Sequence, residues 1–198
     1  YDLLAEPERE VLSRLSTFAG GWTLEAAEDV CAGNGIDRAN VLDLMTRLVD
    51  KSLVIVGADH EGHRRYRFLD TVRHYALEKL QETGQADGPA DRHLHFYVEF
   101  AERARNELVG PQQGAWLARL DREFENLLAA HARCDNATGG GAAGLRLVYS
   151  IRFYLLSRGL LALGERLSLE AVARPGAKAA GLWRCRGLAV AGQFLYYR

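Results

Sequence analysis

The stretch from Asp50 to Leu80 restricts the fold more than any other part of the sequence. Residues 52–56 are almost wholly apolar, and over 64–69 aromatic side chains alternate with arginines, so both segments are predicted to be β-strands. The polar, glycine-containing segment 57–63 between them has the composition of a hairpin tip. Because a two-stranded hairpin is only marginally stable alone, it must pack on neighbouring elements.

Helical patterns on both sides of the hairpin supply those neighbours. The predicted helices cover 7–19, 24–31, 37–51 and about 70–82. Thr23 and Asp37 are predicted to cap the second and third of these helices. Three helices, a β-hairpin and a fourth helix over residues 1–84 make a winged-helix arrangement, so the predicted fold class is mainly α.

The rest of the chain is predicted to be entirely helical. Segment 85–90 has the composition of a linker, 91–135 is predicted to form a connecting helical hairpin, and 136–198 the start of a truncated array of helical repeats. The pattern of 147–158 returns over 187–198, at an offset of 40 residues. Helix, glycine, helix with small residues, then proline is the order of a tetratricopeptide-type (TPR-like) repeat, whose usual period is about 34 residues.

Charge is unevenly distributed along the chain. The formal net charge is −1, which argues against a general binder of nucleic acid or membrane surfaces. Residues 1–84 hold 10 Lys and Arg against 15 Asp and Glu, a net charge of −5, whereas 136–198 hold 9 against 2, a net charge of +7. This asymmetry indicates two modules with different neighbours.

The cysteine pattern and the absence of long apolar runs predict a cytoplasmic chain. Three widely spaced cysteines suit free, buried thiols in a reducing compartment better than a disulfide framework. No run approaches the roughly 20 apolar residues of a membrane span, and no membrane partner is expected. The chain begins at Tyr1 without an initiator Met, and we expect it to be a piece of a longer protein.

Neither a catalytic site nor a metal site is predicted. His60 and His63 lie in the hairpin tip with no third ligand nearby, which is too few for zinc. The glycine run 139–141 lacks the Gly-Lys-Ser/Thr ending of a phosphate-binding loop. We therefore expect no cofactor, no ATP binding and no enzyme activity in this chain.

Four phrases, in a fixed order, resemble one protein family. They are RLSTFAGGWTLEAAEDVC (14–31), LMTRLVDKSLV (44–54), RYRFLDTVRHYALEKL (65–80) and WLARLDREFENLLAA (116–130). The chain resembles the region that follows the nucleotide-binding domain in bacterial STAND-type ATPase regulators, the large LuxR-type and AfsR-like signalling proteins. The resemblance implies a winged helix that regulates and does not read DNA. It would couple an ATP- or ADP-binding domain outside this chain to a helical-repeat sensor of an unknown effector.

The resemblance also implies one candidate nucleotide-sensing position. In related nucleotide-binding switches a Met-His-Asp phrase closes the second strand of the wing, and its His senses the diphosphate. The corresponding phrase here is Phe68-Leu69-Asp70. Leu69 cannot hydrogen-bond a phosphate, and the matching Asp70 is also explained as the N-cap of the next helix.

DNA binding by the winged helix is the main alternative, since winged helices often place a recognition helix in the major groove. That helix would be Asp37–Lys51, in which three cations balance three aspartates. The candidate DNA contacts are Arg38, Arg47, Lys51, Arg64 and Arg65. Because phosphate neutralisation supplies much of the affinity for DNA, the balanced helix and the −5 charge argue against this alternative.

Partner binding is predicted on the basic C-terminal third, where arginines and aromatic residues are interspersed. The candidate contacts are Arg152, Tyr154, Arg158, Trp183, Arg186 and Phe194. The alternative is that the aromatic residues form the core between repeats and the arginines its wet rim. Contacts with the nucleotide-binding domain are predicted near Arg9, Arg14, Arg38 and Arg47. A free-standing repeat scaffold for peptide recognition is a further alternative for the whole chain.

Overall fold

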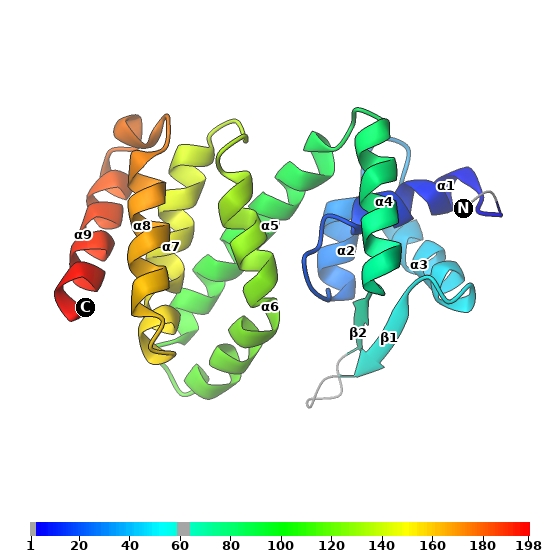
Figure 1. Ribbon diagram of the computed structural model, residues 1–198. Helices are drawn as coiled ribbons and strands as arrows, with labels where there is room; N and C mark the ends of the chain where they lie inside the picture. The colour runs from blue at the N-terminus through cyan, green and yellow to red at the C-terminus, as the bar shows by residue number, and fades with distance from the viewer. Residues whose placement is uncertain (1–2, 59–63) are drawn as a thin grey trace. The chain divides into compact units, whose positions relative to one another are not determined.

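The computed structural model describes residues 3–58 and 64–198 (Figure 1). These residues are mainly helical, with one two-stranded antiparallel sheet. They divide into two compact units, Tyr1–Phe96 and Tyr97–Arg198.

The first unit contains the predicted order of three helices, a hairpin and a helix. Its elements are α1 (Glu6–Leu15), α2 (Leu24–Cys31), the short 3₁₀ helix η1 (Arg38–Asn40), α3 (Val41–Asp50), β1 (Ile55–Ala58), β2 (Arg64–Arg67) and α4 (Asp70–Glu82). Helix α1 packs against α2, α3 and α4. The apolar stripes of α1 and α3 are fully buried, at Val11, Leu15, Met45 and Leu48. The winged helix and the mainly helical fold class are therefore confirmed.

The first strand begins later than predicted. Residues 52–54, expected in the strand, form a tight turn that closes α3: Ser52 has a φ of 60°, and the N–H groups of Leu53 and Val54 donate to the carbonyl of Leu48 at 2.9 and 3.3 Å. The remaining strand pairs Val56 with Tyr66 across the hairpin. Residues 59–63 of the predicted hairpin tip lie outside the described residues.

Of the three residues considered as helix caps, Thr23 is confirmed. Its Oγ1 accepts the N–H of Ala26 at 3.3 Å. Asp37 precedes η1 but makes no capping hydrogen bond. The interpretation of Asp70 as an N-cap is wrong, because Leu69 occupies that position. Asp70 is the first helical residue, where its carboxylate complements the positive end of the helix dipole.

A third strand-like contact, not predicted from the sequence, attaches the wing to the loop before α2. Trp22 and Tyr66 exchange two backbone hydrogen bonds of 2.8 and 2.9 Å. The Trp22 ring is fully buried, 5.3 Å from the ring of Phe18 and 4.9 Å from that of Phe68. Gly21 allows this approach, since a Cβ there would lie 2.8 Å from the carbonyl oxygen of Tyr66.

The second unit is built from the remaining helices. They are α5 (Asp87–Glu107), whose first part belongs to the first unit, α6 (Gln113–Arg133), α7 (Gly140–Ser157), α8 (Leu161–Ala173), the 3₁₀ helix η2 (Ala177–Ala179) and α9 (Leu182–Tyr197). Helix α5 begins inside segment 85–90, for which the sequence predicts a linker. Pro89 is compatible with this start because the first turn of a helix needs no backbone N–H bond.

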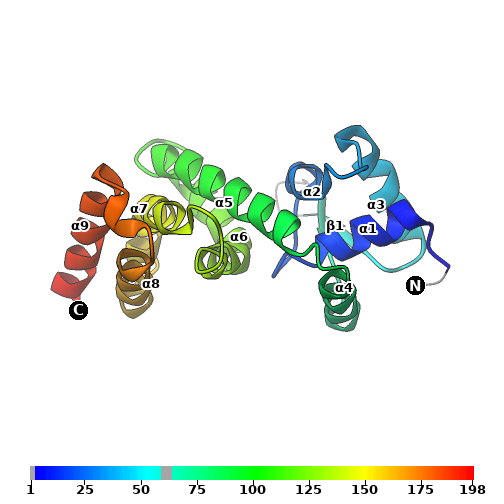
Figure 2. The same cartoon turned by 90° about the horizontal axis from the view of Figure 1, so that it is seen from above.

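Helices α7, α8 and α9 pack against one another, and both views show them side by side (Figures 1 and 2). Two glycines permit this approach: a Cβ on Gly164 would lie 2.4 Å from the ring of Phe194, and one on Gly187 would lie 2.4 Å from Leu145.

The offset of 40 residues seen in the sequence returns at the C-terminal ends of the helices. Helices α6 and α8 end at Arg133 and Ala173, and helices α7 and α9 end at Ser157 and Tyr197. The helices differ in length, since α6 has 21 residues and α8 has 13. The assignment of 136–198 as the start of TPR-like repeats stays a prediction.

Candidate functional site

The helix–turn–helix of the first unit consists of α2 and α3, and α3 is the helix that would enter a DNA groove. Arg38, just before α3, pairs with Asp29 and, at 3.3 Å from Nε to Oε2, with Glu28 on α2. Lys51, just after α3, pairs with Oε2 of Glu8 at 2.5 Å. Carboxylates of the same unit therefore hold the two cations that flank α3.

Glu8 is a buried partner for Lys51. Its side chain also accepts the N–H of Ala5 at 2.8 Å. The hydrogen bond from Lys51, with that of Ala5, holds the pKa of the Glu8 carboxyl below its ordinary value, so the group is charged at neutral pH. Transferring Lys51 to a DNA phosphate would leave this buried carboxylate without its cation, which costs free energy.

The other three candidate DNA contacts differ in their surroundings. Arg65 donates from Nη2 to the carbonyl of Gly21 at 2.9 Å, which holds β2 to the loop before α2. Arg47 on α3 and Arg64 on β2 are exposed. Helix α3 exposes two aspartates beside Arg47, so its own charged residues sum to −1.

Arg14 closes the turn between α2 and α3. Its Nη1 donates to the carbonyls of Cys31 and Gly33 at 2.6 and 2.7 Å, and its Nη2 donates to that of Asn34 at 3.2 Å. The residue is only 5% exposed. The prediction that Arg14 docks on another domain is wrong, because the side chain is buried in its own.

Leu69 and Asp70, at the position of the Met-His-Asp phrase, are exposed between β2 and α4. Nearby, Arg73 donates from Nε to the carbonyl of Phe18 at 2.6 Å and holds α4 against the core. The nucleotide-sensing role of Asp70 stays a prediction.

Three of the six predicted partner contacts gather around Tyr149 of α7. The guanidinium carbon of Arg152 lies 4.1 Å from the centroid of the Tyr149 ring, and that of Arg186 on α9 lies 5.0 Å from it. Arg186 is also 4.6 Å from the ring centroid of Trp183. The Trp183 ring meets that of Tyr149 edge to face at 6.0 Å.

The other three predicted contacts join helices inside the second unit. The hydroxyl of Tyr154, which is 2% exposed, donates to Asp121 Oδ1 of α6 at 3.0 Å. Arg158 makes a two-point pair with the same carboxylate, at 2.9 and 2.5 Å. Phe194 is fully buried against Gly164 of α8. Tyr154 and Phe194 thus lie in the core between helices, and Arg158 at its rim.

Two arginines outside the six predicted contacts belong with this group, and sequence reasoning missed the first of them. Arg105 of α5 lies 5.5 Å from the Tyr149 ring centroid, and Arg146 of α7 lies 6.0 Å from that of Trp183. Arg105 sits in a different predicted segment, so no spacing along the chain connects it with α7. The arginine–aromatic surface is defined as Arg105, Arg146, Tyr149, Arg152, Trp183 and Arg186.

The match to a known domain agrees with the geometry of the first unit. Residues 4–81 match the family model described as "Winged helix-turn-helix domain". These residues are a winged helix-turn-helix domain.

Some relatives of the chain are named as putative transcriptional regulators. "Putative HTH-type transcriptional regulator Rv0890c" of Mycobacterium tuberculosis and "Putative HTH-type transcriptional regulator Mb0914c" of Mycobacterium bovis are each 45% identical to it over 132 residues. The match covers 67% of this chain and 15% of each relative, so the chain spans about 15% of their length. "Uncharacterized protein Rv0894" of M. tuberculosis is 44% identical over 94 residues, 47% of this chain and 24% of the relative. No solved structure matches.

Metal ligands and membrane spans were sought among the described residues. No group of three or more His, Cys, Asp or Glu side chains there could hold a metal ion. His60 and His63 lie outside the described residues. No described helix is long and apolar enough to cross a membrane.

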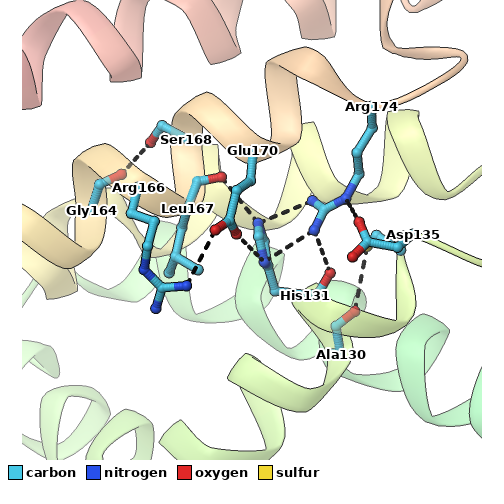
Figure 3. Close-up of polar contacts among 10 residues, drawn as sticks. Ala130, His131, Asp135, Gly164, Arg166, Leu167, Ser168, Glu170 and Arg174 are labelled. Carbon is cyan, nitrogen blue, oxygen red and sulfur yellow. Dashed lines mark hydrogen bonds and ion pairs between the residues drawn. The ribbon is translucent and has the colours of Figure 1, made fainter.

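Beyond the winged helix-turn-helix domain, a buried polar network joins α6 to α8 (Figure 3). Arg174 donates to Asp135 Oδ1 at 2.6 Å and to the carbonyl of His131 at 2.8 Å, and its guanidinium lies 3.0 to 3.2 Å from both ring nitrogens of His131. His131 Nε2 lies 3.0 Å from the carbonyl of Leu167. Burial and the charge of Arg174 lower the pKa of His131 to about 4, so the ring is neutral at pH 7. Its role is to hold helices together.

Proposed function

We propose that this chain is the winged-helix and helical-repeat segment of a STAND-type transcriptional regulator, and that its winged helix acts through contacts with other protein parts. The cations that flank α3 carry this proposal. Arg38 and Lys51 are paired inside the domain, and α3 itself sums to −1. A helix that reads DNA needs cations free to neutralise phosphates.

In this proposal the chain is non-catalytic and cytoplasmic. This chain has no phosphate-binding loop, so it would not hold the nucleotide itself. In the proposal, ATP or ADP binds to a nucleotide-binding domain elsewhere in the same protein. The exposed Arg47 of α3 and Asp70 at the start of α4 are candidates for contact with that domain. The TPR-like helices α7, α8 and α9, within 136–198, receive the effector or protein partner.

DNA binding by the winged helix-turn-helix domain is the second candidate. The domain match and the names of the relatives favour it. In this case Arg47 on α3 and Arg64 on β2 would contact phosphates or bases, since both are exposed.

Fluorescence anisotropy with a labelled random-sequence DNA duplex at physiological salt separates the two candidates. We expect the complete chain to bind no tighter than about 10 µM, the range of non-specific binding. Submicromolar binding that is weakened at least tenfold in an Arg47→Gln/Arg64→Gln double variant would establish the DNA-binding candidate. Arg198→Gln, just after α9, is the matched control, because it removes an exposed arginine far along the chain from the domain.

A further inference from the structure

The arginine–aromatic surface holds more positive charge than the described carboxylates beside it neutralise. Arg105, Arg152 and Arg186 come from α5, α7 and α9, and the guanidinium carbons all lie within 5.5 Å of the centroid of the Tyr149 ring. Helices α7 and α9 contain no Asp or Glu at all. Burial, with the nearby charges of Arg105 and Arg186, lowers the pKa of Arg152. Like charges held this close repel one another, and a bound anion would relieve the repulsion.

One carboxylate beside the surface already pairs with one of its arginines. Glu102 of α5 accepts from Nε and Nη2 of Arg146, both at 2.8 Å, a two-point pair that lowers the pKa of Glu102. Glu99 adds a second negative charge near Arg146. Four arginines against these two glutamates leave an excess of two positive charges. Among the described residues, no ion pair joins Arg152 or Arg186 to a carboxylate.

The aromatic rings favour a polypeptide over a nucleic acid. A single-stranded nucleic acid binds when its bases stack on free aromatic faces. Here guanidinium groups already lie over the rings of Tyr149 and Trp183. Arg152 Nη1 donates to the carbonyl of Tyr149 at 2.6 Å, so a ligand would bind the remaining N–H groups of the guanidiniums, whose flat fork matches a carboxylate.

We propose that the arginine–aromatic surface binds an extended acidic polypeptide segment, whose Asp and Glu carboxylates pair with Arg152, Arg186 and Arg105. This rests on the proposed function in one respect, namely that the helical unit receives a protein partner. The inference adds the chemistry of that partner. Three donors on three helices fit a segment with several carboxylates better than a single small anion.

Fluorescence anisotropy with a labelled Glu-rich peptide tests the proposal on the complete chain. We expect micromolar affinity that falls as salt is raised. An Arg152→Gln/Arg186→Gln variant should bind at least tenfold more weakly, and Arg105→Gln alone should weaken binding less. Arg166→Gln is the matched control: Arg166 is an exposed arginine of α8 whose guanidinium pairs with Glu170. Circular dichroism shows whether each variant is folded. If the double variant does not fold, Arg105→Gln still tests the surface.

Three results would overturn the proposal. The first is no binding of the Glu-rich peptide by the folded chain. The second is equal weakening by Arg166→Gln and by the double variant, which indicates non-specific attraction. The third is binding of a single-stranded oligonucleotide in preference to the peptide. None of them bears on the duplex-DNA measurement, which tests the winged helix-turn-helix domain through Arg47 and Arg64, so the two hypotheses can fail separately.

Discussion

Arg14 is the residue on which the shape of the helix–turn–helix most depends. One guanidinium satisfies three backbone carbonyls at the end of α2 and in the turn that follows. Carbonyls at a helix end have no partner within the helix, so they need such a donor when they are buried. The sequence does not reveal this role, because an arginine on an amphipathic helix is usually exposed.

Replacing Arg14 with Met should therefore destabilise the first unit. The variant keeps much of the side-chain volume but leaves the buried carbonyl of Cys31 without this donor, and we expect a loss of about 1–3 kcal/mol in the free energy of unfolding. Urea denaturation followed by circular dichroism measures it. Arg67→Met on the exposed side of β2 is the control and should change stability by less than about 0.5 kcal/mol. Equal stability of the two variants would contradict the role given to Arg14.

His131 should make the second unit sensitive to acid. Its pKa is about 4 in the folded chain and about 6.5 when unfolded, so between these values the unfolded state binds more protons. The contribution of the neutral ring to the free energy of unfolding is therefore fully present above pH 6.5. It decreases as the pH drops towards 4, by up to about 3 kcal/mol. Arg174, Asp135 and Glu170 are the charged groups that face the ring.

The measurement is urea denaturation of the parent chain and of His131→Gln at pH 7 and pH 4.5. The parent should lose more stability than the variant over this range, since the carboxylates around the ring titrate in both. Equal losses would show that His131 does not contribute.

At the scale of elements, close packing between the helices of the second unit requires glycine at the contact points. Gly164 of α8 faces the ring of Phe194, and an added Cβ would lie 2.4 Å from its atoms. Gly164→Ala should destabilise the second unit by about 1–3 kcal/mol, although alanine is the better helix former. Gly192→Ala on α9 is the matched control, because nothing lies within 4 Å of its added Cβ. This control should be neutral or stabilising by up to about 1 kcal/mol, and the reverse order would contradict the packing described.

Elements were predictable where a repeating pattern specifies them. Helical spacing predicted α1 to α4, and alternation of aromatic residues with arginines predicted β2. The start of β1 was not predictable from apolar character, because the left-handed turn at Ser52 depends on how α3 ends. The bridge to Tyr66 involves a single residue, Trp22, in the loop before α2. One residue produces no periodic pattern in the sequence, so the bridge was not predictable.

For the candidate sites, the sequence predicted the residue types better than it predicted their positions in space. Arginines and aromatic residues do gather in the last third of the chain, as expected. However, Arg152 and Tyr154 are two residues apart on one helix and therefore point about 200° apart around its axis. The first lies over Tyr149 and the second is bonded to Asp121. Which face meets a neighbouring helix depends on contacts far along the chain.

At the scale of the whole molecule, charge distinguishes the two proposed interactions. Residues 1–84 sum to −5 and residues 136–198 to +7. The acidic segment includes the domain whose relatives are named as regulators, and the basic segment includes most of the arginine–aromatic surface. The chain spans about 15% of the length of those regulators, so nucleotide binding and output belong to other parts of them under the proposed function.

The two backbone hydrogen bonds between Trp22 and Tyr66 have a mechanical consequence. They tie β2 to the residue that precedes the cap of α2, and the Trp22 ring is wedged between Phe18 and Phe68. A partner that pushes the wing aside must either break both bonds or drag the indole out of its aromatic neighbours. A displacement of the wing is therefore coupled to the helix–turn–helix, because the wing cannot move without disturbing the residues that precede α2.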